Sequence, residues 1–448
     1  AKTMYYNPND NTTRLIESFI SKAEAKQRRG RAGRVREGLS YKLFSKRLYE
    51  EDMVEMPTPE IKRVALESLY ISVKAMGVKN VTKFLASGLE CPPLKALKKA
   101  ERMLTTVGLL DSEDFALTEL GRFISLMPVM DSKHGKLLIY SILFGITDVG
   151  ILTASLLSIG GLPFISGMEN RDKIKKILSQ YKTKGDVLAA VQIIREYLQI
   201  DDRVKRRQFM KDNLLSYNRM NDIMSSRVQY YSILKDIGFL PFNYKPGESI
   251  EFNRNQHNIE LVEAILTGAY YPNVARVELP DAKYLATASG AIEKDPEAKA
   301  IKYWIRNEEY VDKIFELNKD DKKPFPQQDE ENKTFPSTRA FIHPSSILFH
   351  SNSVDLEEIK SLEEMSDINE KYTNKNPMLK FPFVLYNSSH FTSKLFLREI
   401  TPTSTLSLLL FGGPITYDIN GDNHSPGIVV DDWLPVRTWC KNAVLIKQ

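Results

Sequence analysis

QRRGRAGR, at residues 27–34, places four arginines and two glycines in one short stretch of this chain of 448 residues. The run before it is rich in Ala, Lys and Glu, which favour helix, and Ser21 is a suitable residue to cap the first turn. Glycine often follows the end of a helix, so Gly38 is the predicted stop. The pattern therefore predicts a helix that carries the arginines on it or at its end.

The residue types in this stretch suit the binding of a phosphate group. Gln27, Arg31 and Arg34 fall at i, i+4 and i+7, so a helix would place one amide and two guanidiniums in a column. A guanidinium is planar and always charged, and it stabilises the charge that develops on a transferring phosphoryl group. Gly30 and Gly33 would let a nucleotide or another domain approach the backbone. The alternative is a plain basic patch for nucleic acid or nuclear import, which needs no particular spacing.

Composition sets the limits for the rest of the chain. A mass of 51.2 kDa predicts several small domains, and a net charge of +5 with pI near 8.8 fits an anionic partner. Cys91 and Cys440 lie far apart, and the six histidines are dispersed, so we expect no disulfide framework and no metal site. The apolar runs are too short to span a bilayer, so we expect no membrane segment.

Patterning along the first 270 residues predicts a hairpin followed by helices. Two β-favouring runs flank PNDN within residues 2–20. Helical periodicity resumes after Pro57 and Pro59, which predicts a domain boundary near residue 56. Residues 94–126 combine a helix and an acidic turn in a winged-helix-like order, and residues 129–270 predict a helical bundle.

The rest of the chain predicts a small barrel. Beyond Pro272 the β-rich pieces are RAFIHPSSILF, FPFVLYNSSHF, KLFLREIT and LSLLLFGG. Residues 318–338 are charged, contain proline and have few apolar side chains, which predicts a flexible loop. The acidic run that starts at Ser353 predicts a second surface excursion.

QRRGRAGR resembles motif VI of superfamily 2 helicases in the DEAH/RHA group, and ISKAEAK before it is similar to the usual lead-in of that group. PEIKRVALESL, LTELGRFISLMPV, FIHPSSILF and HFTSKLFLREIT resemble segments of the group's accessory domains. The resemblance covers essentially the whole chain and implies a multidomain α+β fold. Its expected units are the end of the second RecA-like α/β domain with the hairpin (1–56), a winged helix (57–125), a helical ratchet bundle (126–268) and an OB-fold β-barrel (269–448) with charged insertions near 281–338 and 353–376.

The same resemblance implies an ATP-dependent RNA helicase or RNP remodeller that works 3′ to 5′, with this chain as its C-terminal part. Gln27, Arg31 and Arg34 would then contact ATP on its γ-phosphate side as catalytic residues, and Gly30 would also belong to the ATP-binding site. The residues contain neither a GxxxxGK[ST] phosphate loop nor a DEAH box, so the Mg²⁺ ligands are expected in a first RecA-like domain outside this sequence. We therefore expect that this chain alone does not hydrolyse ATP.

Single-stranded or structured RNA is the partner that the resemblance implies. Thr392, Ser393 and Lys394 match an RNA-facing TSK-type element of the OB-fold, although a strand edge with a solvent lysine is the alternative. Asn213 and Arg227 are weaker candidates for phosphate contacts from the bundle, where most polar side chains are merely solvated. The hairpin in residues 2–20 would help to separate strands, and an ordinary surface hairpin is the alternative.

Arg29 and Val35 make the motif similar to that of the RHA-like branch, which implies a cytoplasmic role on the small ribosomal subunit or another RNP, with a nuclear or nucleolar location left open. The resemblance also makes a G-patch-type activator protein a possible partner. In one departure, Val187 follows Asp186 where many relatives carry histidine. The basic run DDRVKRRQF, from residue 201, favours a solvated helix end, with a contact to RNA as the alternative. The alternative function is a non-catalytic scaffold that binds RNA or the ribosome.

Overall fold

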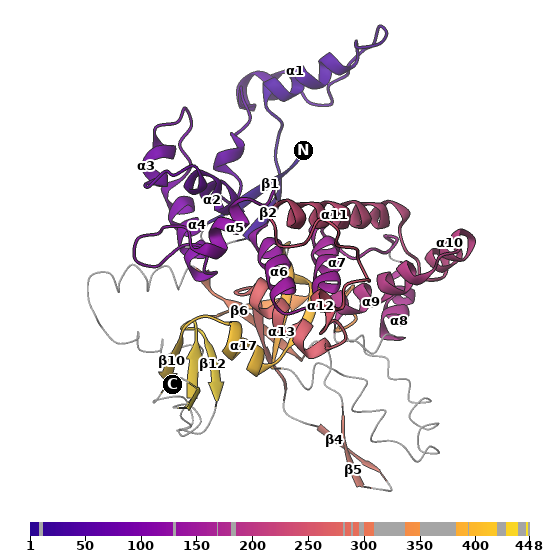
Figure 1. The fold of residues 1–448 in the computed structure, drawn as a ribbon. Helices are drawn as coiled ribbons and strands as arrows, with labels where there is room; N and C mark the ends of the chain where they lie inside the picture. The colour runs from indigo at the N-terminus through magenta and orange to yellow at the C-terminus, as the bar shows by residue number, and fades with distance from the viewer. Residues whose placement is uncertain are drawn as a thin grey trace.

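The structure is a computed structural model, shown as a ribbon in Figure 1. It describes residues 1–8, 12–128, 131–167, 169–180, 185–280, 283–287, 290–294, 300–308, 337–349, 382–392, 394–418, 427–437 and 445–446. The predicted flexible loop at 318–338 lies almost wholly outside these residues, and the predicted excursion from Ser353 lies wholly outside them.

A closed barrel of five strands forms the later part of the chain. Neighbouring strands pair in the order β8, β3, β6, β7, β9, and β9 pairs again with β8, so the sheet closes on itself. All of these pairings are antiparallel except that of β7 with β9. The small barrel predicted from sequence is confirmed, and it is consistent with an OB-fold. Its strands are β3 Val274–Glu278, β6 Lys302–Arg306, β7 Ser337–Ile342, β8 Phe383–Phe391 and β9 Leu395–Thr403.

The predicted N-terminal hairpin is also confirmed, and it joins the barrel. β1 (Lys2–Asn7) pairs antiparallel with β2 (Thr12–Glu17). β2 then pairs in parallel with the end of β8, where Thr13 faces His390. The barrel sheet therefore continues into the first residues of the chain, to give seven strands in all.

Helices occupy the middle of the chain, as predicted. Four helices come directly before the bundle, and a two-residue β-bridge between Leu110 and Leu117 lies between the third and the fourth of them. They are α2 Glu67–Ala75, α3 Val81–Ala86, α4 Leu94–Thr106 and α5 Glu119–Ser125. The bundle follows with α6 Ser132–Leu143, α7 Thr147–Ser158, α8 Arg171–Gln180, α9 Asp186–Gln199, α10 Arg203–Asp212, α11 Tyr217–Asp236, α12 Ile250–Asn253 and α13 Ile259–Tyr270.

The centre of the bundle is α7, which is buried along most of its length. α6 and α7 touch closely at Gly150, where an added Cβ would lie 1.7 Å from the Ser141 hydroxyl oxygen. Asp148 at the start of α7 accepts hydrogen bonds from the hydroxyls of Tyr231 and Tyr244 at 2.6 Å each and from the Asn253 amide at 3.1 Å. One carboxylate thus ties α7 to α11, to the loop after it and to α12.

One predicted strand is wrong. LSLLLFGG was expected to be β-rich, but α17 spans Thr405–Phe411. The hydroxyl of Ser404 accepts a hydrogen bond from the Ser407 N–H at 3.1 Å and so caps the helix, and Leu408 faces the core at a helical spacing. Beyond α17, β10 (Ile415–Asp418), β11 (Gly427–Val430) and β12 (Leu434–Arg437) form a separate sheet. β4 (Lys283–Thr287) and β5 (Gly290–Lys294) form a further hairpin within the predicted insertion.

A buried ion cluster connects α4, the barrel and the C-terminal sheet. Glu308, just after β6, contacts Lys99, Arg102 at 2.9 Å and Arg306 at 2.6 Å. Arg306 also contacts Asp431 at 2.7 Å, and both Arg306 and Glu308 are buried. Burial alone would raise the pKa of Glu308, but the charges of Arg306 and Lys99 lower it to about 2. The three parts are therefore joined by charge as well as by apolar packing.

Candidate nucleotide and nucleic-acid interfaces

The arginine motif lies on an arm that stands away from the rest of the described chain in Figure 1. Its helix, α1, spans Lys22–Arg31. The predicted cap at Ser21 is confirmed, because the Ser21 hydroxyl accepts from the Glu24 N–H at 3.1 Å and the Glu24 carboxylate accepts from the Ser21 N–H at 2.8 Å. At its base, the Lys22 N–H donates to the Val54 carbonyl at 2.9 Å. The start of the helix is therefore fixed.

The predicted end of this helix at Gly38 is wrong. α1 ends at Arg31, and Arg34 lies in the turn that follows. Two glycines within four residues lower the helix propensity at this point. The chain then folds back so tightly that a Cβ on Gly38 would lie 2.1 Å from the Ala32 carbonyl oxygen. The predicted column of three side chains is therefore reduced to Gln27 and Arg31 on the helix, with Arg34 beyond its end.

All three candidate side chains are exposed. Gln27, Arg31 and Arg34 have no hydrogen bond or ion pair with any residue that the structure describes. The carbonyl end of a helix carries partial negative charge, so the guanidiniums themselves must supply the attraction for an anion here. A Cβ on Gly30 would meet nothing within 4 Å. The described part of the chain therefore leaves this surface open to a partner.

The predicted RNA-facing element lies in the tight turn between β8 and β9. The Thr392 N–H donates to the Lys394 carbonyl at 3.0 Å. The Lys394 ammonium lies 4.6 Å from the centre of the Phe341 ring, close enough for a cation–π contact. Ser393, the middle residue of the predicted element, lies outside the described residues.

Lys394 belongs to a larger set of basic and aromatic side chains, which we call the barrel-tip patch. Arg14 of the hairpin lies 4.8 Å from the centre of the Phe391 ring. A guanidinium nitrogen of Arg398 lies 3.2 Å from Nε2 of His343. Cations interleaved with aromatic rings suit the backbone and bases of a single strand. The patch comprises Arg339, Phe341, His343, Lys394, Phe396 and Arg398. Arg14 and Phe391 lie at the same end of the β8–β9 hairpin, but the register places Phe391 on the opposite face, together with Leu395.

The charge of the patch comes from its arginines and its lysine. Burial, and then the charge of Arg398, lowers the pKa of His343 to about 4. His343 is therefore neutral near pH 7 and can stack or hydrogen-bond without adding charge. Sequence reasoning missed most of the patch, since its side chains lie on or next to β7 and β9 and only the pairing of these two strands brings them together.

Asn213 and Arg227 lie elsewhere, on the bundle. Asn213 is the C-cap residue of α10, and its amide donates to the Phe209 carbonyl at 3.0 Å. The Arg227 guanidinium lies 5.3 Å from the centre of the Tyr231 ring on α11. Both contacts are local, so the structure does not join these two residues to the arm or to the barrel-tip patch.

Asp186 makes the polar contact between α9 and the barrel, so the neighbouring position does not need a polar side chain. Its carboxylate accepts hydrogen bonds from the N–H groups of Ile347 at 2.8 Å and Ile400 at 3.1 Å, so it fixes α9 to the barrel. Burial raises the pKa of Asp186 to about 6. Val187 is itself only 2% exposed and packs in the core. The polar contact at this position therefore belongs to the aspartate.

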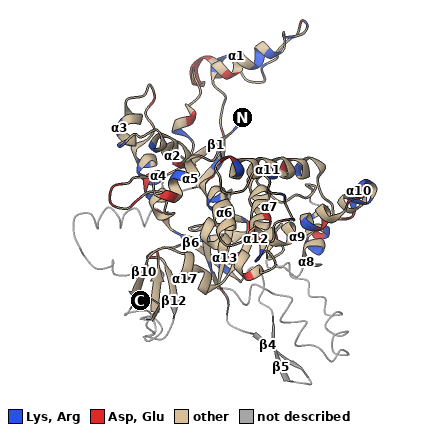
Figure 2. Ribbon diagram, in the orientation of Figure 1, with Lys and Arg blue, Asp and Glu red and all other residues tan. Residues whose placement is uncertain are grey.

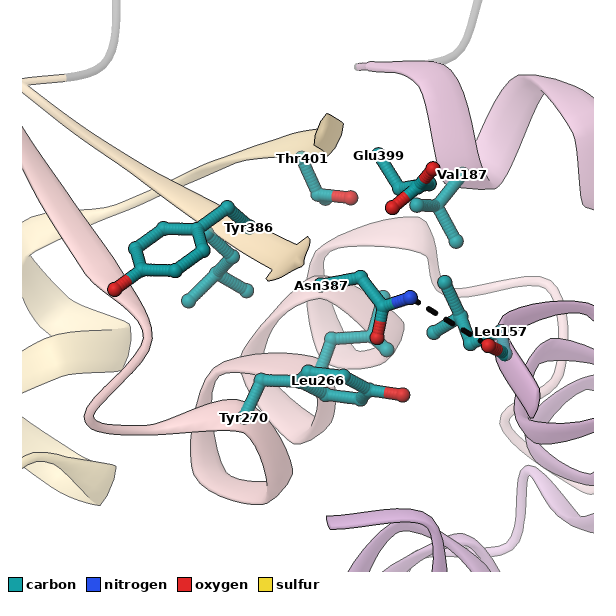
Figure 3. Close-up of a pocket in the computed structure, with 9 residues that line it drawn as sticks. Leu157, Val187, Leu266, Tyr270, Tyr386, Asn387, Glu399 and Thr401 are labelled. Carbon is teal, nitrogen blue, oxygen red and sulfur yellow. Dashed lines mark hydrogen bonds between the residues drawn. The ribbon is translucent and has the colours of Figure 1, made fainter. Parts of the chain in front are cut away.

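The junction between bundle and barrel contains a small cavity, drawn in Figure 3. Leu157, Tyr270, Tyr386, Asn387 and Glu399 are among its lining residues. Its volume is about 10 Å³, enough for one water molecule. It cannot hold a nucleotide or a base.

Two kinds of feature are absent from the residues that the structure describes. Among them, no three or more His, Cys, Asp or Glu side chains gather as metal ligands would. Within the same residues, no helix has both the length and the apolar character needed to cross a bilayer.

Comparison with known proteins identifies the family. Residues 262–415 match the oligonucleotide/oligosaccharide-binding (OB)-fold family. A relative in Saccharomyces cerevisiae, named "Putative ATP-dependent RNA helicase", is 63% identical over 448 residues, which are 100% of this chain and 31% of that protein. A relative in Mycosarcoma maydis, named "Putative DEAH-box ATP-dependent helicase", is 27% identical over 470 residues, covering 100% of this chain and 26% of that protein.

A third relative, the DExH-box ATP-dependent RNA helicase DExH3 of Arabidopsis thaliana, is 26% identical over 419 residues, covering 93% of this chain and 28% of that protein. The chain thus spans less than a third of the length of each of these relatives. Homology that extends over essentially the whole chain, with an OB-fold region in the barrel, shows that the chain belongs to the DEAH/DExH family of RNA helicases.

Proposed function

We propose that this chain is the nucleotide-sensing and RNA-binding part of an ATP-dependent RNA helicase. The observation that carries the proposal is that Arg31 and Arg34 are exposed and have no partner among the described residues, on the arm of a chain homologous to helicases. Guanidiniums without a carboxylate partner keep their N–H donors available, and their planar fork can pair with a phosphate through two charge-assisted hydrogen bonds.

In this proposal Arg31 and Arg34 meet the γ-phosphate of ATP bound by a separate phosphate-loop domain. The positive charge of the two arginines stabilises the transition state more than the ground state, because negative charge spreads over the phosphoryl oxygens in the transition state. The Gln27 amide lies one turn earlier on the same helix and can orient a group beside that phosphate. Any Mg²⁺ would be bound by residues of the phosphate-loop domain, outside this chain.

The barrel-tip patch is the proposed contact for single-stranded RNA. Its cations attract the backbone, and its rings can stack bases of any sequence, as a translocating enzyme requires. The helices around the 110–117 bridge support the proposed winged helix at 57–125. The remaining proposed units are the end of a RecA-like domain at 1–56, the ratchet bundle at 126–268 and the OB-fold at 269–448.

RNA-stimulated ATP hydrolysis by the full-length protein tests the proposal. Arg31→Ala is expected to reduce turnover by 10³-fold or more, on the order of the contribution of an arginine finger, with RNA affinity changed little. Arg36→Ala is the matched control, since Arg36 is equally exposed but lies outside the motif. Turnover by Arg31→Ala equal to that of Arg36→Ala would overturn the assignment.

The resemblance of Arg29 and Val35 to the RHA-like branch supports a finer proposal, namely a cytoplasmic RNP or ribosomal substrate and 3′ to 5′ movement. Crosslinking the protein to its bound RNA would then enrich small-subunit ribosomal RNA. Enrichment of pre-mRNA would contradict this branch assignment.

A further inference from the structure

α10 is a second basic surface, away from both the arm and the barrel-tip patch. It projects from the edge of the bundle, and its Lys and Arg residues appear in blue in Figure 2. Asp202 caps the helix by accepting from the Lys205 N–H at 2.7 Å. Arg206 fixes its orientation, because this side chain donates to the Ile200 carbonyl at 2.7 Å and lies 5.4 Å from the centre of the Tyr197 ring. The helix is therefore held firmly while its outer face stays exposed.

The outer face carries a column of unpaired cations. Arg203, Arg207 and Lys211 fall at i, i+4 and i+8, and all three are exposed. None of them has a carboxylate within 4 Å in the part of the chain that the structure describes. The carboxylate of Asp212 accepts from the Gln208 amide at 2.7 Å. The three cations are therefore left without an ion-pair partner among the described residues, and the carboxylates of Asp202 and Asp212 lie at the two ends of the helix.

The chemistry of this face indicates which anionic partner it fits. Proteins that bind single strands stack bases on aromatic rings, but Phe209, the aromatic residue of α10, is half-buried against the bundle. A helix that lies on a membrane needs an apolar face, and Val204 is the exposed apolar residue here, at 75%. A helix face that carries cations, but neither aromatic rings nor an apolar surface, suits a phosphate backbone whose bases are already paired.

We propose that α10 binds the phosphate backbone of duplex RNA next to the strand held at the barrel-tip patch. The inference rests on the proposed function, because it names a second RNA contact of the same enzyme. At a rise of about 1.5 Å per residue the column is about 12 Å long. The column therefore spans several phosphates of one strand, so each of the three cations can meet a different phosphate.

The position of α8 supports this arrangement. α8 and α10 both pack on α9, and the three helices form one edge of the bundle in Figure 1. The Lys175 ammonium of α8 donates to the Phe349 carbonyl at 3.2 Å, so α8 reaches the barrel. Arg171 at the start of α8 lies close enough to His343 of the patch for its charge to lower the pKa of that imidazole, after burial and Arg398. Basic side chains therefore extend from the patch toward α10.

The test compares the affinity of this chain for a blunt RNA duplex and for a single strand, measured by fluorescence anisotropy over a range of salt concentrations. The variant is Arg203→Gln with Arg207→Gln and Lys211→Gln. We expect its duplex affinity to fall tenfold or more, and the slope of log affinity against log salt to fall by about 2 to 3, at about 0.9 per lost phosphate contact. Single-strand affinity should be unchanged.

The matched control is Lys79→Gln with Lys83→Gln and Lys98→Gln, which removes the same charge from exposed positions elsewhere. An equal loss in the control, or no loss in the α10 variant, would overturn the inference. So would a loss of binding to anionic phosphatidylserine vesicles without a loss on the duplex, which would assign α10 to a membrane. If the wild-type chain binds the single strand but not the duplex, the α10 inference alone fails. If it binds neither, the proposed function fails as well.

Discussion

The buried cluster around Glu308 gives the sharpest stability prediction. Glu308→Ala removes the carboxylate that faces Lys99, Arg102 and Arg306, and the side chain of Glu308 is only 9% exposed. Lys99 and Arg306 would then stay buried with too little negative charge beside them. Breaking such a buried arrangement costs about 3–5 kcal/mol.

The pKa of Glu308 gives a second estimate of the free energy that this carboxylate contributes to folding, and the two estimates are similar in size. A shift from 4.5 to about 2 corresponds to about 3 kcal/mol at 1.36 kcal/mol per pKa unit. Because the folded-state pKa is lowered, this stabilisation is complete above about pH 4.5 and is lost as the pH falls toward 2. The stability difference between the wild type and Glu308→Gln should therefore shrink over that range.

Tryptophan fluorescence during urea unfolding is a suitable assay, because Trp304 lies in β6 and Trp433 is buried beside β12. Glu90→Gln is the control, since Glu90 pairs with Lys62 at 2.5 Å but is 52% exposed. This exposed pair should contribute less than about 1 kcal/mol. If Glu308→Ala costs no more than Glu90→Gln, the ion cluster does not hold these parts together.

Two further predictions concern the bundle and the barrel tip. Asp148→Ala leaves the hydroxyls of Tyr231 and Tyr244 without their acceptor, so it should lower stability by about 3 kcal/mol or more in thermal unfolding, whereas Asp236→Ala on the exposed face of α11 should have little effect. Equal midpoints for these two variants would contradict the role of Asp148. Lys394→Ala should weaken the binding of single-stranded RNA and lower the slope of log affinity against log salt by about 0.7, which fluorescence anisotropy can measure. Lys98→Ala, at an exposed position elsewhere, should change neither quantity.

Local sequence signals were sufficient for much of the architecture. The turn residues at 8–11 predicted the hairpin, Ser21 predicted the helix cap, and the long helical periodicity predicted the bundle. LSLLLFGG was misread because an apolar run of that length fits a strand or a helix equally well. Ser404, the capping serine before this run, was the signal that could have identified the run as a helix.

The features that depend on distant contacts could not be predicted. Arg14 reaches Phe391 only through the pairing of β2 with β8, two strands that lie far apart in the sequence. Lys99 and Glu308 look like ordinary surface charges in the sequence, and only the packing of α4 on the barrel buries them. The end of α1 at Arg31 was missed because the motif suggested a regular column, although its glycines already argued against a continuous helix.

Strand displacement by the full-length protein tests the central claim most directly. The substrate is an RNA duplex with a 3′ single-stranded tail, and the reaction is followed with and without ATP for the wild type and for Arg31→Ala. We predict ATP-dependent displacement by the wild type, and none by Arg31→Ala although that variant still binds the RNA. Tight RNA binding by the wild type with no displacement in the presence of ATP would contradict the account and identify a non-catalytic RNA-binding scaffold.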